Sequence, residues 1–115
     1  MAEEHVPLAP RVVAILIALS EGPLHGYALL KRLSERAEVG LRPGPTTLYR
    51  TLHELEDGGL VEQAEDRPDR ALDDDRRRYY RLTRAGRAVL QAEIARLDRV
   101  LAWARSARAQ PEAGR

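Results

Sequence analysis

Groups that can bind phosphate are concentrated in one short stretch of the sequence, residues 76–87. This stretch holds six arginines and no acid, whereas residues 60–75 hold seven acids and two arginines. A guanidinium forms paired, charge-assisted hydrogen bonds with phosphate oxygens, so the stretch predicts a surface that contacts a polyanion. The alternative is that Asp73, Asp74 and Asp75, which directly precede the arginines, neutralise them.

A second group of candidate side chains begins a predicted helix over residues 45–57. Pro45 suits a first helical turn, and Leu48, Leu52 and Leu55 repeat at helical spacing. The outward positions of the first turns are Thr46, Thr47, Tyr49 and Arg50. Hydroxyls and free N–H groups at a helix N-terminus suit phosphate oxygens, and an arginine can bind O6 and N7 of guanine. The group predicts a helix that contacts DNA through its N-terminal end, against the alternative of an ordinary capped, solvated turn.

The remaining composition argues against catalysis, metal binding and membrane insertion. The chain has no cysteine, and His5, His25 and His53 are scattered without other ligands at metal-binding spacing. No Ser/His/Asp arrangement or phosphate-cradling loop is present, so we predict no enzyme activity, no metal and no cofactor. There is no signal peptide and no apolar run of about 18 residues, which predicts a cytoplasmic protein without a membrane partner.

The elements that must position these groups form one small domain. A chain of 115 residues has room for a single core. Hydrophobic spacing predicts helices over 10–20, 26–37 and 45–57, strands over 60–64 and 77–82, and a final helix over 84–108. This α-α-α-β-β-α order predicts a mainly α winged helix-turn-helix with a small β-hairpin, the wing.

Four segments follow from these elements. We expect a disordered tail over residues 1–7, the winged helix-turn-helix over 8–83, a dimerisation helix over 84–108 and a second disordered tail over 109–115. Gly58 and Gly59 can end the third helix, and Thr83 can cap the last one.

Strand alternation divides the side chains of the wing between two faces. Tyr80 and Leu82 are expected to face the core, while Arg77 and Arg81 stay open. The predicted phosphate contacts of the wing are Arg76, Arg77 and Arg78. Lys31 and Arg32 in the second helix are lesser phosphate candidates.

The last helix carries an apolar stripe at alternating spacings of four and three, which is typical of a coiled-coil seam. The predicted dimer contacts are Leu90, Ile94, Leu97, Val100, Leu101, Trp103 and Ala104. The alternative is that the stripe packs on the first helix of the same chain.

Four motifs together resemble one family, the PadR-type transcriptional regulators. They are His25-Gly26-Tyr27-Ala28-Leu29, Thr47-Leu48-Tyr49 with Leu52 through Leu55-Glu56, Gly59-Leu60-Val61, and Arg77-Arg78-Tyr79-Tyr80-Arg81-Leu82-Thr83 with Gly86. The resemblance implies a homodimeric repressor of its own or a neighbouring gene, with the last helix exchanged across the dimer. It also implies release by an effector, and the single final helix is similar to the short branch of the family.

The leading hypothesis is therefore a sequence-specific DNA-binding regulator. Its expected partners are a pseudo-palindromic DNA operator, a second copy of the chain and a small-molecule effector. Some relatives carry an aromatic residue midway along the last helix for planar ligands, whereas this chain has Ile94 to Leu97 there. The alternative function is a winged-helix protein-interaction module without specific DNA binding.

Overall fold

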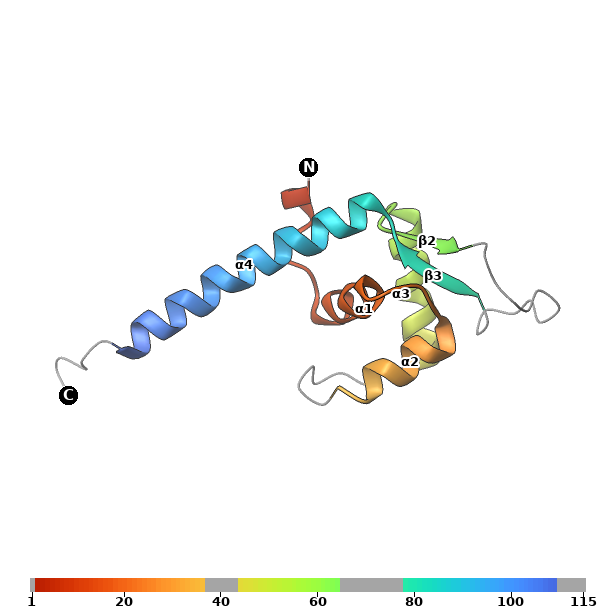
Figure 1. Ribbon diagram of the computed structural model, residues 1–115, viewed down its shortest axis with the longest axis horizontal. Helices are drawn as coiled ribbons and strands as arrows, with labels where there is room; N and C mark the ends of the chain where they lie inside the picture. The colour runs from red at the N-terminus through yellow and green to blue at the C-terminus, as the bar shows by residue number, and fades with distance from the viewer. Residues whose placement is uncertain (1, 37–43, 65–77, 110–115) are drawn as a thin grey trace.

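The computed structural model describes residues 2–36, 44–64 and 78–109. The elements in chain order are η1 (Ala2–His5), α1 (Pro10–Ser20), β1 (Leu24–His25), α2 (Gly26–Ser34), α3 (Pro45–Asp57), β2 (Val61–Ala64), β3 (Tyr79–Leu82) and α4 (Arg84–Ala109). Three short helices and a small sheet form a body from which the long α4 projects (Figure 1). This is the winged helix-turn-helix that the sequence predicted.

The helix ends follow local chemistry. Pro10 and Pro45 occupy the first turns of α1 and α3, where a missing N–H costs no intrahelical bond. At the start of α2 the side chain of His25 accepts a hydrogen bond from the Ala28 N–H at 3.0 Å. Gly58 and Gly59 end α3 as predicted, and Gly59 has a φ of +79°, which favours glycine.

The core lies where the helices meet the sheet. Aliphatic side chains from α1, α2 and α3 fill it together with the ring of Tyr80 from β3, which is fully buried. Helix α1 packs against α2, α4 and β3, so it is the central element. Tyr80 and Leu82 both face the core, as the strand alternation predicted.

The sheet has one strand more than predicted. Its order is β1-β3-β2, with both neighbours antiparallel to β3, and Leu24 pairs with Tyr80 while Val61 pairs with Leu82. A strand of two residues is too short to show alternation, so β1 is visible only through its pairing. The Gly26 N–H also donates to the Arg78 carbonyl at 3.2 Å, which joins the start of α2 to the base of the wing.

Several boundaries differ from the predictions. Strands β2 and β3 begin at Val61 and Tyr79 rather than at residues 60 and 77. Helix α2 ends at Ser34 rather than near residue 37, and α4 continues to Ala109. Residues 2–5, expected within a disordered tail, form η1 and pack beside α4. The rest of the predicted second disordered tail, beyond Ala109, lies outside the described residues.

In the part of the chain that the structure describes, no helix combines the length and the apolar character needed to cross a membrane.

Candidate nucleic-acid interface

The first two turns of α3 present polar groups outward. Leu48, Leu52 and Leu55 are buried as predicted, and this places Thr46 and Arg50 on the exposed side. Gly44 precedes the helix and has no side chain with which to cap it, so the first-turn N–H groups are not occupied by their own N-cap residue. This end of α3 therefore combines N–H donors, a hydroxyl and a guanidinium, a set that suits phosphate and base edges.

Tyr49, predicted as a DNA contact, has a packing role in the structure. Its side chain is half-buried and packs against the hydrophobic core. A Cβ atom added at Gly26 would lie 2.5 Å from the Tyr49 hydroxyl oxygen, so the ring rests directly on the glycine backbone. The absence of a side chain at Gly26 lets the ring turn towards α2, which helical spacing alone does not reveal.

Thr51 and Arg11 form a link between α1 and α3 that the sequence analysis missed. The buried Thr51 hydroxyl donates to the Thr47 carbonyl at 2.8 Å and accepts from Arg11 Nε at 3.3 Å. A threonine hydroxyl commonly bonds the carbonyl one turn back in a helix, but the arginine comes from a distant helix. Arg11 thus adds a second exposed guanidinium beside the candidate helix.

Two further exposed side chains lie on α2. Lys31, a predicted phosphate candidate, is exposed in the last turn of the helix. Tyr27 is exposed in the first turn and stacks with the His25 ring at a centroid distance of 6.5 Å. Helical spacing groups Tyr27 with the apolar residues Leu29, Leu30 and Leu33 of this helix, whereas the structure leaves Tyr27 exposed.

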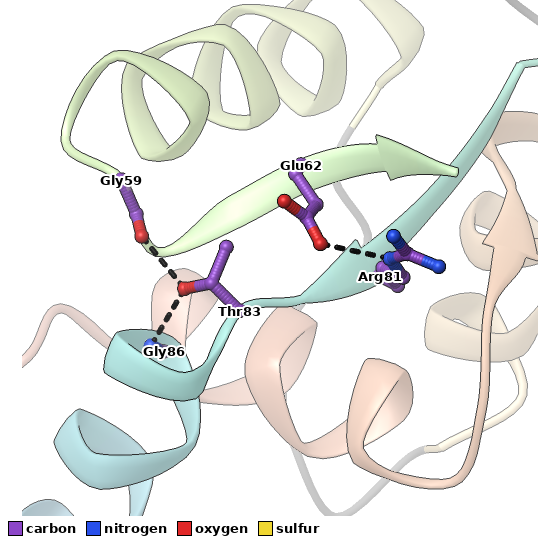
Figure 2. A network of polar contacts seen from close by, with 5 residues as sticks. All are labelled: Gly59, Glu62, Arg81, Thr83 and Gly86. Carbon is purple, nitrogen blue, oxygen red and sulfur yellow. Dashed lines mark hydrogen bonds and ion pairs between the residues drawn. The ribbon is translucent and has the colours of Figure 1, made fainter. Parts of the chain in front are cut away.

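The described base of the wing holds one of its three candidate arginines. Arg78 is half-buried beside the start of α2. Arg76 and Arg77 lie outside the described residues, as do the three aspartates that were the alternative partners. Arg81 is exposed as predicted, and its Nε donates to Glu62 Oε2 at 2.8 Å across the paired strands (Figure 2). That exposed ion pair balances the Arg81 charge within the sheet.

Thr83 fastens the wing to α3 and starts α4. Its hydroxyl donates to the Gly59 carbonyl at 2.6 Å and accepts from the Gly86 N–H at 3.0 Å (Figure 2). Its own N–H donates to the Leu60 carbonyl at 3.1 Å. The prediction that Thr83 caps the last helix is confirmed, and the bond to Gly59 shows that it also holds the turn after α3.

The apolar stripe of α4 divides into a buried and an exposed part. Leu90 is 4% exposed and belongs to the core of its own chain, which corrects its assignment to the dimer interface. It is buried because the first turns of α4 pack on α1 and η1. The other predicted contacts are all exposed: Ile94, Leu97, Val100, Leu101, Trp103 and Ala104.

The exposed side chains of α4 do not share one direction. At about 100° per residue, Ile94, Leu97, Leu101 and Ala104 lie on one stripe, whereas Trp103 lies about 120° from Leu97 around the helix. Trp103 is 73% exposed within the single chain. We name the four stripe residues the α4 stripe.

A buried carboxylate marks the place where α4 leaves the body. Glu93 is 1% exposed, and its two oxygens accept from Arg96 Nε at 2.8 Å and Arg96 Nη2 at 2.9 Å. Glu93 Oε2 also accepts from the Leu8 N–H at 3.4 Å. The hydrogen bonds from Arg96 lower the pKa of Glu93 and outweigh the opposing effect of its burial. Sequence reasoning missed Glu93 because a glutamate within a helix ordinarily faces solvent.

The lowered pKa of Glu93 predicts a stability term that depends on pH. Because the carboxylate is favoured in the folded state, its contribution is complete above the pH where an unfolded glutamate titrates, about 4.3, and is lost as the pH falls through the lower folded value. We expect Glu93→Gln to reduce the free energy of unfolding by about 1.5–3 kcal/mol at pH 7. Urea unfolding at pH 7 and at successively lower pH values should show the difference between variant and wild type shrinking.

Glu62→Gln is the matched control for that experiment. Its ion pair with Arg81 is about half-exposed on both sides, so the substitution should cost less than about 1 kcal/mol at any pH. A difference between Glu93→Gln and wild type that stays constant at acidic pH would contradict the assignment of the effect to the ionised carboxylate.

Among the described residues, no cluster of three or more histidine, cysteine, aspartate or glutamate side chains has an arrangement that could hold a metal ion. The polar groups of the site are instead donors and cations on α3, α2 and the wing. Three helices, a wing paired to the second of them through β1, and a donor-rich first turn on the third define a winged helix-turn-helix protein of the DNA-binding class.

Comparison with known proteins identifies the family. The model of the transcriptional regulator PadR-like family matches residues 15–92, and the chain belongs to this family. It is therefore a DNA-binding transcriptional regulator and not an enzyme, in agreement with the sequence-based prediction.

Among curated relatives, the transcriptional regulator Rv3488 of Mycobacterium tuberculosis is 39% identical over 84 residues, covering 73% of this chain and 72% of the relative. An uncharacterised 37.1 kDa protein in transposon TN4556 of Streptomyces fradiae is 37% identical over 86 residues. That match covers 75% of this chain but only 22% of the transposon protein. The solved structure of a PadR family transcriptional regulator from Eggerthella lenta is 28% identical, with a TM-score of 0.64 over 89% of this chain and 87% of that one.

Proposed function

We propose that the chain acts as a homodimeric repressor of its own or a neighbouring gene, binding a pseudo-palindromic operator in the cytoplasm. The observation that carries this proposal is that one chain exposes two separate surfaces. One is the donor-rich N-terminal end of α3, and the other is the α4 stripe. A DNA-reading helix and a self-association surface on one chain are the two parts that a dimeric regulator needs.

Within this proposal α3 reads the major groove. Arg50 is exposed and is the candidate for a guanine contact, while Thr46 and Thr47 hold the helix end against phosphate. Tyr49 contributes by packing on Gly26, which fixes α3 against α2. Lys31 is a further phosphate contact on α2.

The wing supplies sequence-independent affinity. Arg78, at the described base of the wing, directly follows Arg76 and Arg77 in the sequence, and together the three carry three positive charges. Because phosphate contacts release counterions from DNA, this part of the affinity should fall steeply with salt. The exposed pair between Arg81 and Glu62 leaves Arg81 as a structural residue of the sheet.

The α4 stripe pairs two copies of the chain. Leu97 and Leu101 are 41% and 46% exposed, and they follow the point where α4 leaves the body. Apolar side chains at alternating spacings of three and four pack into those of a second helix. A small-molecule effector that weakens DNA binding remains a prediction from the family resemblance.

Operator selection tests this function. Duplexes selected from a random pool by the purified protein should converge on a sequence with two inverted half-sites about 10 base pairs apart, or a multiple of that spacing. The selected duplex should then compete at least about 10³-fold better than random duplex at physiological salt. Equal affinity for both duplexes would contradict a repressor and favour a winged-helix protein-interaction module.

Substitutions of Arg50 and Arg77 should impair DNA binding in different ways. Arg50→Ala removes the proposed guanine contact, so it should cost about 1–3 kcal/mol on the selected operator and relax preference at one base position. Arg77→Ala should weaken binding to all sequences alike and reduce the salt slope by about one. Fluorescence anisotropy over a salt series measures both effects.

Arg99→Ala is the control for those two variants. Arg99 is an exposed arginine on the projecting part of α4, distant along the chain from α3 and the wing. Its removal lowers the net charge equally and should leave base preference unchanged. Full retention of affinity in both Arg50→Ala and Arg77→Ala would contradict the proposed contacts.

A further inference from the structure

The buried carboxylate of Glu93 lies at a mechanically important position. It is the last buried residue of α4, and the exposed large hydrophobic residues of the helix begin at the next position, Ile94. Its bond to the Leu8 N–H comes from the segment just before α1, which starts at Pro10. One side chain thus connects α4 to the segment leading into the central helix of the body.

The contacts of Glu93 form a clamp of two parts, one within α4 and one to the segment before α1. Two nitrogens of Arg96 bind its two oxygens on the same face of α4, and 85 residues separate Glu93 from Leu8 along the chain. A bidentate guanidinium pair restricts both side chains in direction as well as distance. Arg96 lies on α4 itself and only orients the carboxylate, whereas the Leu8 N–H, at 3.4 Å from Glu93 Oε2, is the contact that joins α4 to the segment before α1. Because a buried carboxylate that loses a donor is penalised, this contact resists relative movement of the two segments.

The part of α4 beyond Glu93 acts as a lever. Ala109 lies sixteen positions after Glu93, a helical length of about 24 Å. A tilt of about 10° at Glu93 therefore moves the far end by roughly 4 Å, close to the 3.4 Å spacing of successive base pairs. A small change in the angle between α4 and the body is enough to change the register of two half-sites.

We propose that Glu93, held by Arg96 and bonded to Leu8, is a positioning residue that fixes the angle at which α4 leaves the body, and thereby sets the half-site spacing that the dimer accepts. The inference rests on the dimer and the DNA binding proposed above. It assigns to one buried carboxylate a role in operator selectivity without any contact to DNA.

The first measurement needs no DNA. Because the chain has no cysteine, Ser34→Cys on α2 and Ser106→Cys on α4 give two unique sites for spin labels, both exposed. Doubly labelled protein diluted into unlabelled protein reports the distance between the body and the far part of α4 within one chain. We expect a narrow distance distribution in the otherwise wild-type protein and a broader or shifted one in Glu93→Gln. Glu35→Gln, which removes the same charge from an exposed position at the end of α2, should leave the distribution unchanged.

The second measurement uses the selected operator with the spacer between its half-sites lengthened or shortened by one and two base pairs. Wild-type protein and Glu35→Gln should prefer one spacing, whereas in Glu93→Gln the preference over neighbouring spacings should fall about tenfold. A folded Glu93→Gln variant with wild-type distances and wild-type spacing preference overturns the proposal.

A second variant tests the proposal if Glu93→Gln does not fold. Arg96→Lys keeps the positive charge and removes the two-nitrogen contact, and the same two outcomes apply to it. The experiments distinguish a failure of this proposal from a failure of the repressor function. If the variants show broadened distances but the protein shows no operator preference, the clamp is supported and the repressor function is refuted. If the protein is a specific DNA-binding dimer but the variants keep wild-type distances, the repressor function is supported and the clamp is refuted.

Discussion

The double substitution Leu97→Glu/Leu101→Glu is expected to convert the protein to a monomer and to weaken operator binding about 10²–10⁴-fold. Both side chains lie on the α4 stripe and are exposed in the single chain, so the substitution should not disturb the core. In the proposed dimer four carboxylates would meet across an apolar seam, where burial of unpaired charge is strongly unfavourable. Light scattering measures the mass, and circular dichroism measures the helix content that should persist.

Ala102→Glu combined with Ser106→Glu is the matched control. These exposed positions on α4 lie off the α4 stripe, at roughly 100–180° around the helix from Leu97 and Leu101. They add the same charge to the same helix and should leave the dimer intact. A Leu97→Glu/Leu101→Glu variant that remains a dimer with full operator affinity would contradict the role assigned to the α4 stripe.

Gly86→Ala is expected to give the largest loss of stability of any single substitution considered, about 2–4 kcal/mol in the free energy of unfolding. An added Cβ would overlap the Leu60 carbonyl oxygen and lie 3.3 Å from Leu82 Cδ2. The carbonyl cannot withdraw freely, because it accepts the Thr83 N–H. The clash outweighs the better helix propensity of alanine, about 1 kcal/mol. Urea unfolding followed by circular dichroism measures the loss.

Gly58→Ala separates the clash from a general effect of replacing glycine. Gly58 has a φ of −82°, and an added Cβ there meets only ordinary contacts at 3.5 Å and 3.8 Å. This substitution should be neutral or stabilising by up to about 1 kcal/mol. A Gly86→Ala protein as stable as Gly58→Ala would mean that Leu60 and α4 separate at little cost.

The sequence predicts the main elements well because their ends carry strong local signals. Pro10, Pro45 and the pair Gly58-Gly59 bound two helices at the residues where the structure begins and ends them. What it missed depends on contacts distant in the sequence. Strand β1 exists only through pairing with β3, and the burial of Glu93 requires the N-terminal segment to lie against α4.

The candidate site shows the same division between residues that local spacing places and residues that distant contacts place. Thr46 and Arg50 could be placed outward from helical spacing alone, since each needs only the position of the leucines on α3. Tyr49 could not, because its ring is drawn towards a glycine on another helix. Likewise, the alternating spacing of four and three includes Leu90 among the predicted dimer contacts, whereas in the structure Leu90 is buried by packing on α1 of its own chain. Periodicity identifies an apolar face but not what covers it.

The division of α4 at Glu93 has a consequence for cells that hold several copies of such a gene. The buried residues of α4 all lie at or before Glu93, while its exposed large hydrophobic residues lie beyond it and are available for pairing under the proposed dimer. After a gene duplication, substitutions in the exposed half can therefore change which subunits pair without disturbing the fold of either copy. Duplicated regulators can in this way become insulated from mixed dimers, through a few changes on one short helical surface.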